Sequence, residues 1–380
     1  MAKENIEKIH IKPLRVLISG GGTGGHIFPA LAIADELKRR YPACEILFVG
    51  AEDRMEMQRV PAAGYRIEGL PVAGFDRKKL WRNIGVLLKL YRSMSKAKRI
   101  IREFRPQVAV GVGGYASGPT LKAAQKANIP TLLQEQNSYA GVTNKLLAAK
   151  AECVCVAYPD MEKFFPSAKI VLTGNPIRKK LLDTGISREE AKEKLGFDAS
   201  RPLVLVTGGS LGARTLNNVM KEAVCSGIAA DAPFQVLWQC GSVNGDDCAE
   251  SVGSQLPPNV KLTDFISDMA IAYRAADLVV SRAGAGTISE LELLGKPCVL
   301  VPSPNVAEDH QRHNAEALAL RGAAAMVLDV DAAAQLWREM SSIVSNPETL
   351  RLLSENIAQM AQHDSDIKIV DAITELIAKE

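Results

Sequence analysis

The sequence predicts an α/β fold in two domains, each built on an open parallel sheet with helices on both faces. Three observations lead to this prediction. The chain has 380 residues, which is too many for one compact core. Short β-branched runs alternate with helical patterns, as they do when helices connect parallel strands. The alternation starts again after "TGNPIRKK", so we expect the junction between the domains at the turn Gly174–Pro176.

The predicted boundaries are a first domain over residues 1–176, a second over 177–363 and a final amphipathic helix over 364–380. In the first domain the predicted strands cover residues 14–19, 45–50, 107–114, 131–136 and 153–157, with helical patterns at 30–40 and 118–127. In the second domain the predicted strands cover residues 202–210, 234–241, 259–265, 276–284 and 297–304.

Composition and charge place the chain among ordinary globular proteins. Apolar residues make up 47% and charged residues 23%, and a net charge of +3 gives no reason to expect nucleic acid as a partner. No apolar stretch reaches the roughly 18 residues of a membrane span, and "MAKENIEKIH" lacks the apolar segment of a secretory signal. The seven cysteines include no CxxC pair, so we expect reduced thiols in the cytoplasm, with Cys153 and Cys155 buried in a strand.

Three glycine-rich loops, each between a strand and a helix, are the main functional signal. They lie at Gly20–Gly25, Thr207–Arg214 and Ser281–Glu290. Glycine permits tight turns and close approach to a ligand, and a helix N-terminus favours phosphate. Because ligands of open α/β sheets bind at the carboxyl ends of the strands, three such loops predict a nucleotide in a cleft between the domains.

The first loop alone does not identify a nucleotide site. A purely structural turn accounts for one such loop equally well. The sequence "GGGTGG" also loosely resembles the phosphate fingerprint of dinucleotide-dependent oxidoreductases, with Glu52 or Asp53 as the acid for the ribose. The second and third loops disfavour that class, because a dehydrogenase needs only one such pocket.

Seven motifs carry a family resemblance. Between Gly20 and Ala315 they occur in the order "GGGTGGHIFPALAIA", "GVGGYASGP", "QEQNSYAGVTNKLLA", "TGNPIR", "GGSLGAR", "SRAGAGTISEL" and "DHQRHNA". As an ordered set they resemble the MurG family of peptidoglycan N-acetylglucosaminyltransferases. The resemblance implies the glycosyltransferase B (GT-B) architecture, in which two Rossmann-like domains face each other across a cleft and the last helix packs back on the first domain.

The resemblance also implies an activity. It is the inverting transfer of N-acetylglucosamine from UDP-N-acetylglucosamine to the C4 hydroxyl of the N-acetylmuramoyl group of undecaprenyl-linked lipid I, which makes lipid II for peptidoglycan. The first domain would receive the acceptor at the cytoplasmic face of the bacterial membrane, as a peripheral protein, and the second would bind the UDP-sugar. We expect no cofactor and no metal. A UDP-sugar epimerase of the same fold and a non-catalytic nucleotide-sugar binder remain alternatives.

His26 and Glu135 are the candidate catalytic residues. Histidine suits the removal of a proton from the acceptor hydroxyl near neutral pH, although His26 could instead cap the following helix or orient a loop. Glu135, in "QEQN", is a second candidate base, and its structural alternative is an ion pair with a nearby cation.

The resemblance assigns further residues to the substrates. Arg178 is expected to hold the diphosphate, Glu290 the ribose hydroxyls, Ile266 the uracil through its backbone, and Gln311 the sugar hydroxyls. The full set of expected substrate-binding residues is Thr23, Gly24, Gly25, Asn137, Arg178, Ser210, Ile266, Ala285, Gly286, Thr287, Ile288, Ser289, Glu290 and Gln311.

Several of these residues also have structural alternatives. They are a tight turn at Thr23–Gly25, a solvent-exposed side chain for Arg178, a helix cap at Ser210 and a core position for Ile266. The sequence "DVD" at Asp329–Asp331 resembles the metal-binding pair of other glycosyltransferases, but its place after an apolar run favours a turn or a helix cap.

A basic segment runs from Arg77 to Arg105, with eleven basic residues and one acidic residue, Glu103. Its apolar residues recur at helical spacing: Ile84, Leu87, Leu88, Tyr91 and Met94. A basic amphipathic helix can lie on an anionic membrane surface. The alternative is a helix that packs on its own sheet and exposes its basic face to water.

Overall fold

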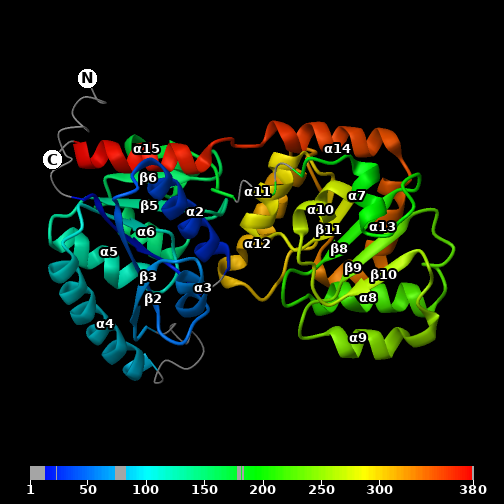
Figure 1. The fold of residues 1–380 in the computed structure, drawn as a ribbon, viewed down its shortest axis with the longest axis horizontal. Helices are drawn as coiled ribbons and strands as arrows, with labels where there is room; N and C mark the ends of the chain where they lie inside the picture. Colours follow the sequence, from blue (N-terminus) through cyan, green and yellow to red (C-terminus); the bar gives the residue numbers. More distant parts are fainter. Residues whose placement is uncertain (1–12, 23, 73–82, 178–180, 182–183, 379–380) are drawn as a thin grey trace. The chain divides into compact units, whose positions relative to one another are not determined.

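The computed structural model describes residues 13–22, 24–72, 83–177, 181 and 184–378. The chain divides into two compact units (Figure 1). Unit 1 comprises Met1–Ile177 with Gln362–Glu380, and unit 2 comprises Arg178–Ala361. Each unit is built on one parallel sheet flanked by helices, so the predicted class of two α/β domains is confirmed.

Unit 1 contains a seven-stranded sheet in the order β3-β2-β1-β4-β5-β6-β7, with every neighbouring pair parallel. Its strands are β1 (Arg15–Ser19), β2 (Glu45–Ala51), β3 (Arg66–Leu70), β4 (Val108–Gly111), β5 (Thr131–Glu135), β6 (Cys153–Val156) and β7 (Ile170–Leu172). The central strands are continuous apolar runs because helices cover both faces of the sheet.

Two apolar cores lie on the two faces of this sheet. On one face, α2 (Gly24–Arg40) and α15 (Ser365–Ala378) pack against the side of β1 that carries Val16 and Ile18. On the other face, α4 (Asn83–Phe104), α5 (Ser117–Lys126) and α6 (Val142–Ala148) cover the side that carries Leu17. The short helix α3 (Glu56–Ala62) packs beside β2 and β3. The last helix of the chain is therefore part of unit 1 (Figure 1).

Unit 2 contains a six-stranded sheet in the order β10-β9-β8-β11-β12-β13, again with parallel pairs. Its strands are β8 (Leu203–Thr207), β9 (Gln235–Gln239), β10 (Val260–Thr263), β11 (Leu278–Ser281), β12 (Cys298–Leu300) and β13 (Ala325–Met326). The helices α8 (Arg214–Cys225), α9 (Gly245–Val252) and α13 (Ala332–Val344) enclose the core on one face. The other helices are α7 (Arg188–Lys194), α10 (Met269–Ala275), α11 (Ala285–Leu294), α12 (His310–Ala319) and α14 (Pro347–Gln359).

Three edge strands, β3, β7 and β13, are absent from the predictions. β3 carries Arg66 and Glu68 within five residues, β7 has only three residues, and β13 has two. Such short or charged segments give little of the apolar run that marks a buried strand. The predicted packing of Cys153 and Cys155 is confirmed, because neither forms a disulfide and both are buried in the core beside α2 and α15. Among the described helices, none has the length and apolar character to cross a membrane.

Candidate functional site

The first glycine loop, Gly20–Gly22, connects β1 to α2 and is held by the buried carboxylate of Glu56. Glu56 Oε2 accepts a hydrogen bond from the amide of Gly22 at 3.0 Å, and Oε1 accepts one from the amide of Ala51 at 2.9 Å. A Cβ atom at Gly21, where φ is +147°, would collide with this carboxylate. In the sequence, the only signal of Glu56 is an acidic residue at the start of a short helix, so motifs alone do not find it.

His26 lies in the first turn of α2, with its imidazole against Gly113 in the loop after β4. A Cβ atom at Gly113 would come within 2.8 Å of both ring Nε2 and ring Cδ2. Because Ser19 of β1 is paired with Gly111 of β4, the imidazole lies at the carboxyl edge of the unit 1 sheet. The helix already begins at Gly24, so His26 does not occupy its N-cap.

Glu135, at the end of β5, is 2% exposed and is surrounded by N–H donors. It accepts hydrogen bonds from the backbone amide of Asn137 at 3.1 Å, its side-chain amide at 3.2 Å, the amide of Gly141 at 3.0 Å and Asn144 Nδ2 at 2.9 Å. No ion pair joins it to a cation in the described part of the chain, so the predicted alternative of a cation pair is wrong. These hydrogen bonds hold Asn137 and the loop after β5 in place.

Replacing Glu135 by glutamine is expected to lower both activity and stability. The new amide group would face N–H donors and leave buried groups unpaired, at a cost of about 1–3 kcal/mol in the free energy of unfolding. Asn144→Ala should lower activity in the same direction, because it removes one of the donors that hold the carboxylate. Urea unfolding and transfer rates would be measured together. Full activity in Asn144→Ala beside an inactive, stable Glu135→Gln would instead assign Glu135 as the base.

The second glycine loop follows β8 in unit 2 and is folded on the hydroxyl of Thr207. Thr207 Oγ1 accepts a hydrogen bond from the amide of Gly209 at 3.1 Å, and the amide of Gly212 donates to the carbonyl of Gly209 at 2.9 Å. Ser210 is exposed at the tip of this loop. The N-cap position of α8 belongs to Ala213, so the alternative of a helix cap at Ser210 is wrong.

The third glycine loop lies beside the second, because β11 and β8 are paired with Ser281 opposite Thr207. It leads into α11, which begins at Ala285. The N-cap residue is Gly284 in extended conformation, and no side chain caps the helix. The first-turn amides are therefore not covered by a cap, as is typical of helix termini that bind anionic groups.

Two polar side chains of the predicted site, Glu290 and Gln311, flank this loop. Tyr273 Oη donates a hydrogen bond to Glu290 Oε2 at 2.9 Å, and burial raises the pKa of the Tyr273 hydroxyl well above its ordinary value, so the tyrosine remains a donor. On α12, Gln311 Oε1 accepts a hydrogen bond from the amide of Ser303 at 2.9 Å. This contact fixes the side-chain oxygen of Gln311.

The surroundings of Ile266 and of the "DVD" sequence match the structural alternatives for these residues. Ile266 follows β10 and is 8% exposed. Asp329 forms an ion pair with Arg282, and residues 329–331 form a short 3₁₀ turn, as the turn prediction requires. The described residues contain no group of three or more histidine, cysteine or acidic side chains able to hold a metal.

The structure thus brings the predicted residues to the carboxyl edges of two sheets. Gly24, Gly25, His26, Glu135 and Asn137 lie at the edge in unit 1. Ser210, Ile266, Gln311 and the residues from Ala285 to Glu290 (Ala285, Gly286, Thr287, Ile288, Ser289 and Glu290) lie at or beside the edge in unit 2. Thr23 and Arg178 lie outside the described residues.

A buried acid two residues beyond Glu290 makes stability depend on pH. Burial raises the pKa of Glu292 to about 8. The folded state then holds a proton that the unfolded state releases near pH 4.5, so the contribution of Glu292 to stability falls as the pH rises from about 4.5 through 8. Glu292→Gln should remove this fall and gain up to a few kcal/mol at pH 9. Urea unfolding at pH 6 and pH 9 measures the change in the free energy of unfolding of both proteins. An equal change in the wild type and in Glu292→Gln would contradict this prediction.

Comparisons with known proteins agree with this arrangement. The glycosyltransferase family 28 N-terminal domain matches residues 16–156, and the family 28 C-terminal domain matches residues 203–369. The chain is 57% identical, over 99% of both chains, to the UDP-N-acetylglucosamine–N-acetylmuramyl-(pentapeptide) pyrophosphoryl-undecaprenol N-acetylglucosamine transferase of Bacteroides fragilis.

Solved structures give the same result for the fold. The MurG of Acinetobacter baumannii superposes with a TM-score of 0.76 at 29% identity, covering 96% of this chain and 100% of that one. A UDP-GlcNAc 2-epimerase from Neisseria meningitidis has a TM-score of 0.64 at 14% identity, covering 96% of this chain and 100% of that one, and so shares the fold alone. This chain belongs to glycosyltransferase family 28 and, within it, to the MurG family of N-acetylglucosaminyltransferases.

Proposed function

We propose that this chain transfers N-acetylglucosamine from UDP-N-acetylglucosamine to the N-acetylmuramoyl group of lipid I and so forms lipid II. The identity of 57% over 99% of a transferase named for this reaction carries the proposal. The fold alone does not separate the transferase from the epimerase alternative, because an epimerase shares it at 14% identity.

The donor would bind at the carboxyl edge of the unit 2 sheet. The uncapped first turn of α11 and the loop of Ser210 offer N–H groups to the diphosphate. The carboxylate of Glu290 suits the two ribose hydroxyls, and Gln311 suits the hydroxyls of the sugar. Ile266 would contact uracil through its backbone, and Arg178 would neutralise the leaving UDP.

The acceptor would bind in unit 1, where His26 is the proposed general base. Its imidazole would take the proton of the C4 hydroxyl as the oxygen attacks the anomeric carbon and UDP leaves from the opposite face. Inversion of the anomeric centre follows from this single displacement. Glu135 would act indirectly, by fixing Asn137 toward the sugar.

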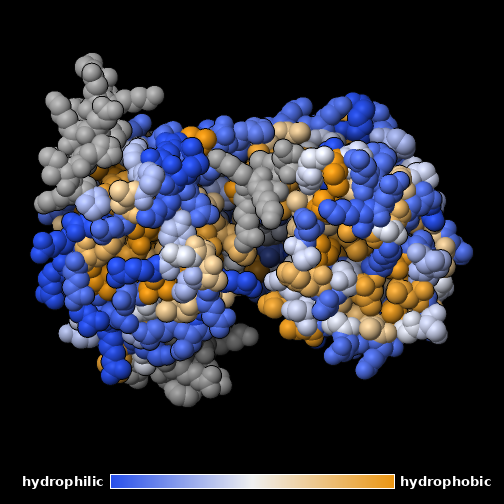
Figure 2. All heavy atoms as spheres, viewed as in Figure 1, coloured by the Kyte–Doolittle hydropathy of each residue, from blue (hydrophilic) through white to orange (hydrophobic). Residues whose placement is uncertain are grey.

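The C-terminal part of α4 supports the packing interpretation of the basic helix. Ala97, Ile100 and Ile101 are at most 5% exposed and belong to the core beneath the helix, against which Met94 also packs. Lys98, Arg99 and Arg102 of this part are exposed, and Figure 2 shows mainly hydrophilic surface where α4 lies.

The N-terminal part of α4 supports a membrane contact. Leu88 is 61% exposed and Tyr91 77%, and the basic residues Lys89 and Arg92 beside them are exposed too. Exposed apolar side chains flanked by cations suit the surface of an anionic bilayer. We therefore place the protein at the cytoplasmic face of the membrane as a peripheral enzyme. Residues 77–82 and the side chains of Ile84 and Leu87 lie outside the described part.

Leu88→Asp combined with Tyr91→Asp should weaken binding to vesicles of anionic lipid by about tenfold or more, because it removes apolar burial and adds repulsion. Sedimentation with vesicles measures the effect. The matched control is Lys98→Gln with Arg102→Gln, at exposed positions of the packed part, which changes the net charge equally and should change binding less. Equal losses in both pairs would mean that only net charge matters, and no loss in either would contradict the membrane contact.

A transfer assay tests the proposed function. Labelled UDP-N-acetylglucosamine would be incubated with the protein, with and without a short-chain lipid I analogue, in EDTA. The proposal predicts label in the lipid product only when the acceptor is present. Donor turnover without acceptor would indicate an epimerase, and binding without turnover would indicate a non-catalytic binder.

A further inference from the structure

A cavity of about 850 Å³ opens in unit 2 away from the glycine loops. Its walls include Asp277 and Pro297, which directly precede β11 and β12. The cavity therefore lies at the amino edge of the parallel sheet, whereas the glycine loops follow the carboxyl ends of the strands. The remaining walls come from residues 184–188, the end of α11 and one side of α14.

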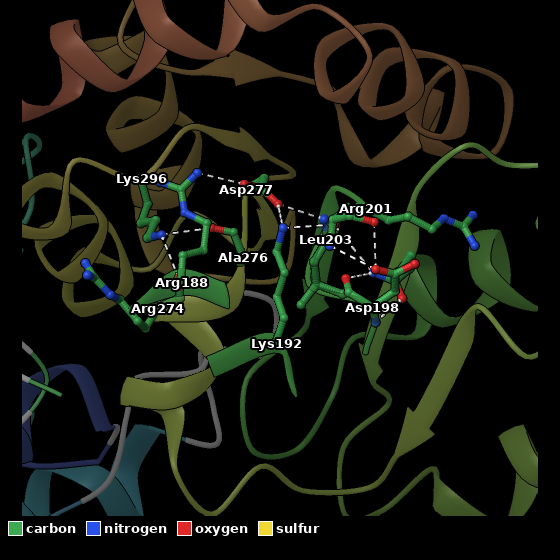
Figure 3. Close-up of polar contacts among 11 residues, drawn as sticks. Arg188, Lys192, Asp198, Arg201, Leu203, Arg274, Ala276, Asp277 and Lys296 are labelled. Carbon is green, nitrogen blue, oxygen red and sulfur yellow. Dashed lines mark hydrogen bonds and ion pairs between the residues drawn. The ribbon is translucent and has the colours of Figure 1, made fainter. Parts of the chain in front are cut away.

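The cavity is lined by an excess of positive charge. Arg188, Arg274 and Lys296 line it, and Asp277 is the one acid among its described lining residues. Arg351 lines it too, but its charge is balanced by ion pairs with Glu348 and Glu355 of the same helix. Figure 3 shows how side chains from α7, α10 and the loop before β12 converge. The volume is that of a pocket for a nucleotide-sized ligand.

The one carboxylate of the cavity already has its partners. Asp277 Oδ1 accepts from Arg188 Nη1 at 2.8 Å, while Oδ2 accepts from Lys192 Nζ at 2.8 Å and from the amide of Leu203 at 2.9 Å (Figure 3). Arg274 uses Nε to donate to the carbonyl of Ile186 at 2.9 Å. Its two terminal nitrogens form no ion pair with any described acid and remain available to a ligand.

Lys296 is the buried cation of the group, at 7% exposure. Its ammonium donates to the carbonyls of Ala276 at 2.8 Å and Arg274 at 3.4 Å. Burial lowers the pKa of Lys296 to about 7. The positive charges of Arg188, Arg274 and Lys192 lower this pKa further, whereas the negative charge of Asp277 raises it. The site thus carries more positive than negative charge, and a bound anion would balance it.

We propose that this cavity binds a small anion carrying two or more phosphates, of the class of diphosphates and nucleoside polyphosphates. Guanidinium groups match phosphate oxygens through paired hydrogen bonds, and Arg188, Arg274 and Lys296 line the same cavity. The site is separate from the proposed donor site, and the inference does not depend on the proposed function.

Anion binding should be coupled to the proton of Lys296. The charged groups that act on this lysine are Arg188 and Lys192 from α7, and Arg274 and Asp277 from α10 and the turn after it. From α14, Arg351 lines the same cavity and is paired with Glu348 and Glu355. A bound phosphate favours the ammonium, so binding at pH 8.5 takes up a proton and weakens relative to pH 7.

Calorimetry with inorganic pyrophosphate tests the proposal, with the donor site occupied by saturating UMP, whose single phosphate lies outside the proposed ligand class. We expect one pyrophosphate site in the wild type, at least tenfold weaker in both Lys296→Met and Arg274→Gln. Arg338→Gln, an exposed arginine of α13 away from the cavity, is the control and should bind normally. The loss of affinity between pH 7 and 8.5 should be smaller in Lys296→Met than in the wild type.

Titrations with other ligands identify the class of ligand and separate this proposal from the proposed function. Tighter binding of ATP than of pyrophosphate assigns a nucleotide, tighter binding of a short-chain polyprenyl diphosphate assigns a lipid-borne diphosphate, and equal binding assigns the diphosphate group alone. If Lys296→Met does not fold, Arg274→Gln decides. No pyrophosphate binding, or equal affinity in all variants, overturns the site. Failure of UMP to bind would count against the proposed function, while the variants would still report on the cavity.

Discussion

Glu290→Gln is expected to lower kcat/KM for UDP-N-acetylglucosamine by about 100- to 1,000-fold. The carboxylate would accept hydrogen bonds from two ribose hydroxyls, and each hydrogen bond to a charged group is worth about 1.5–3 kcal/mol. The loss should appear mainly in the donor KM and in the affinity for UDP, because the ribose contact exists in the ground state as well as the transition state. Calorimetric titration with UDP and steady-state kinetics measure both.

Two variants serve as controls for this prediction. Tyr273→Phe removes the hydroxyl that donates to Glu290 and leaves the carboxylate in place, so its effect should be below about tenfold. Glu339→Gln changes a partly exposed acid of α13 and should have no effect. Normal UDP affinity in Glu290→Gln would exclude the ribose contact.

His26→Ala is expected to lower kcat by about 100- to 10,000-fold, the range of general base catalysis, while the affinity for UDP stays unchanged. This prediction separates the base from a loop-orienting role, which would alter substrate binding as well. A kcat within a few-fold of the wild type would show that another group takes the proton.

The contact between His26 and Gly113 supplies an independent test. Gly113→Ala would push the imidazole from its place, because the new Cβ atom would lie 2.8 Å from ring Nε2. The matched control is Gly64→Ala, at φ +86° compared with +92° at Gly113, with no atom within 4 Å of the new Cβ. Both variants carry a similar backbone cost of about 1–2 kcal/mol. Only Gly113→Ala should lose activity, and equal losses would mean that strain alone is responsible.

The sequence predicts most of the central strands of the two sheets, because parallel strands buried on both faces are continuous apolar runs. Val204–Val206 and Val16–Ile18 are examples, and the glycine loops mark where such strands end. β7 and β13 could not be predicted, because strands of three and two residues are too short to show a run of apolar residues.

The supporting contacts of the site could not be predicted. Glu56 reaches the glycine loop from 34 residues away, and the donors around Glu135 meet it only after the loop has folded. Likewise, Lys296 and Arg188 are far apart in the chain, and no motif joins them. Motifs identify residues that touch a ligand, whereas the residues that hold those groups in place follow from packing.

Label transfer to a lipid I analogue by the wild type and by Glu290→Gln, at a donor concentration below KM, tests the proposed transferase most sharply. We expect acceptor-dependent label in the lipid product, at a rate at least about 100-fold lower in Glu290→Gln. Donor consumption that ignores the acceptor would contradict the proposed transfer, and equal rates in the two proteins would contradict the ribose contact of Glu290.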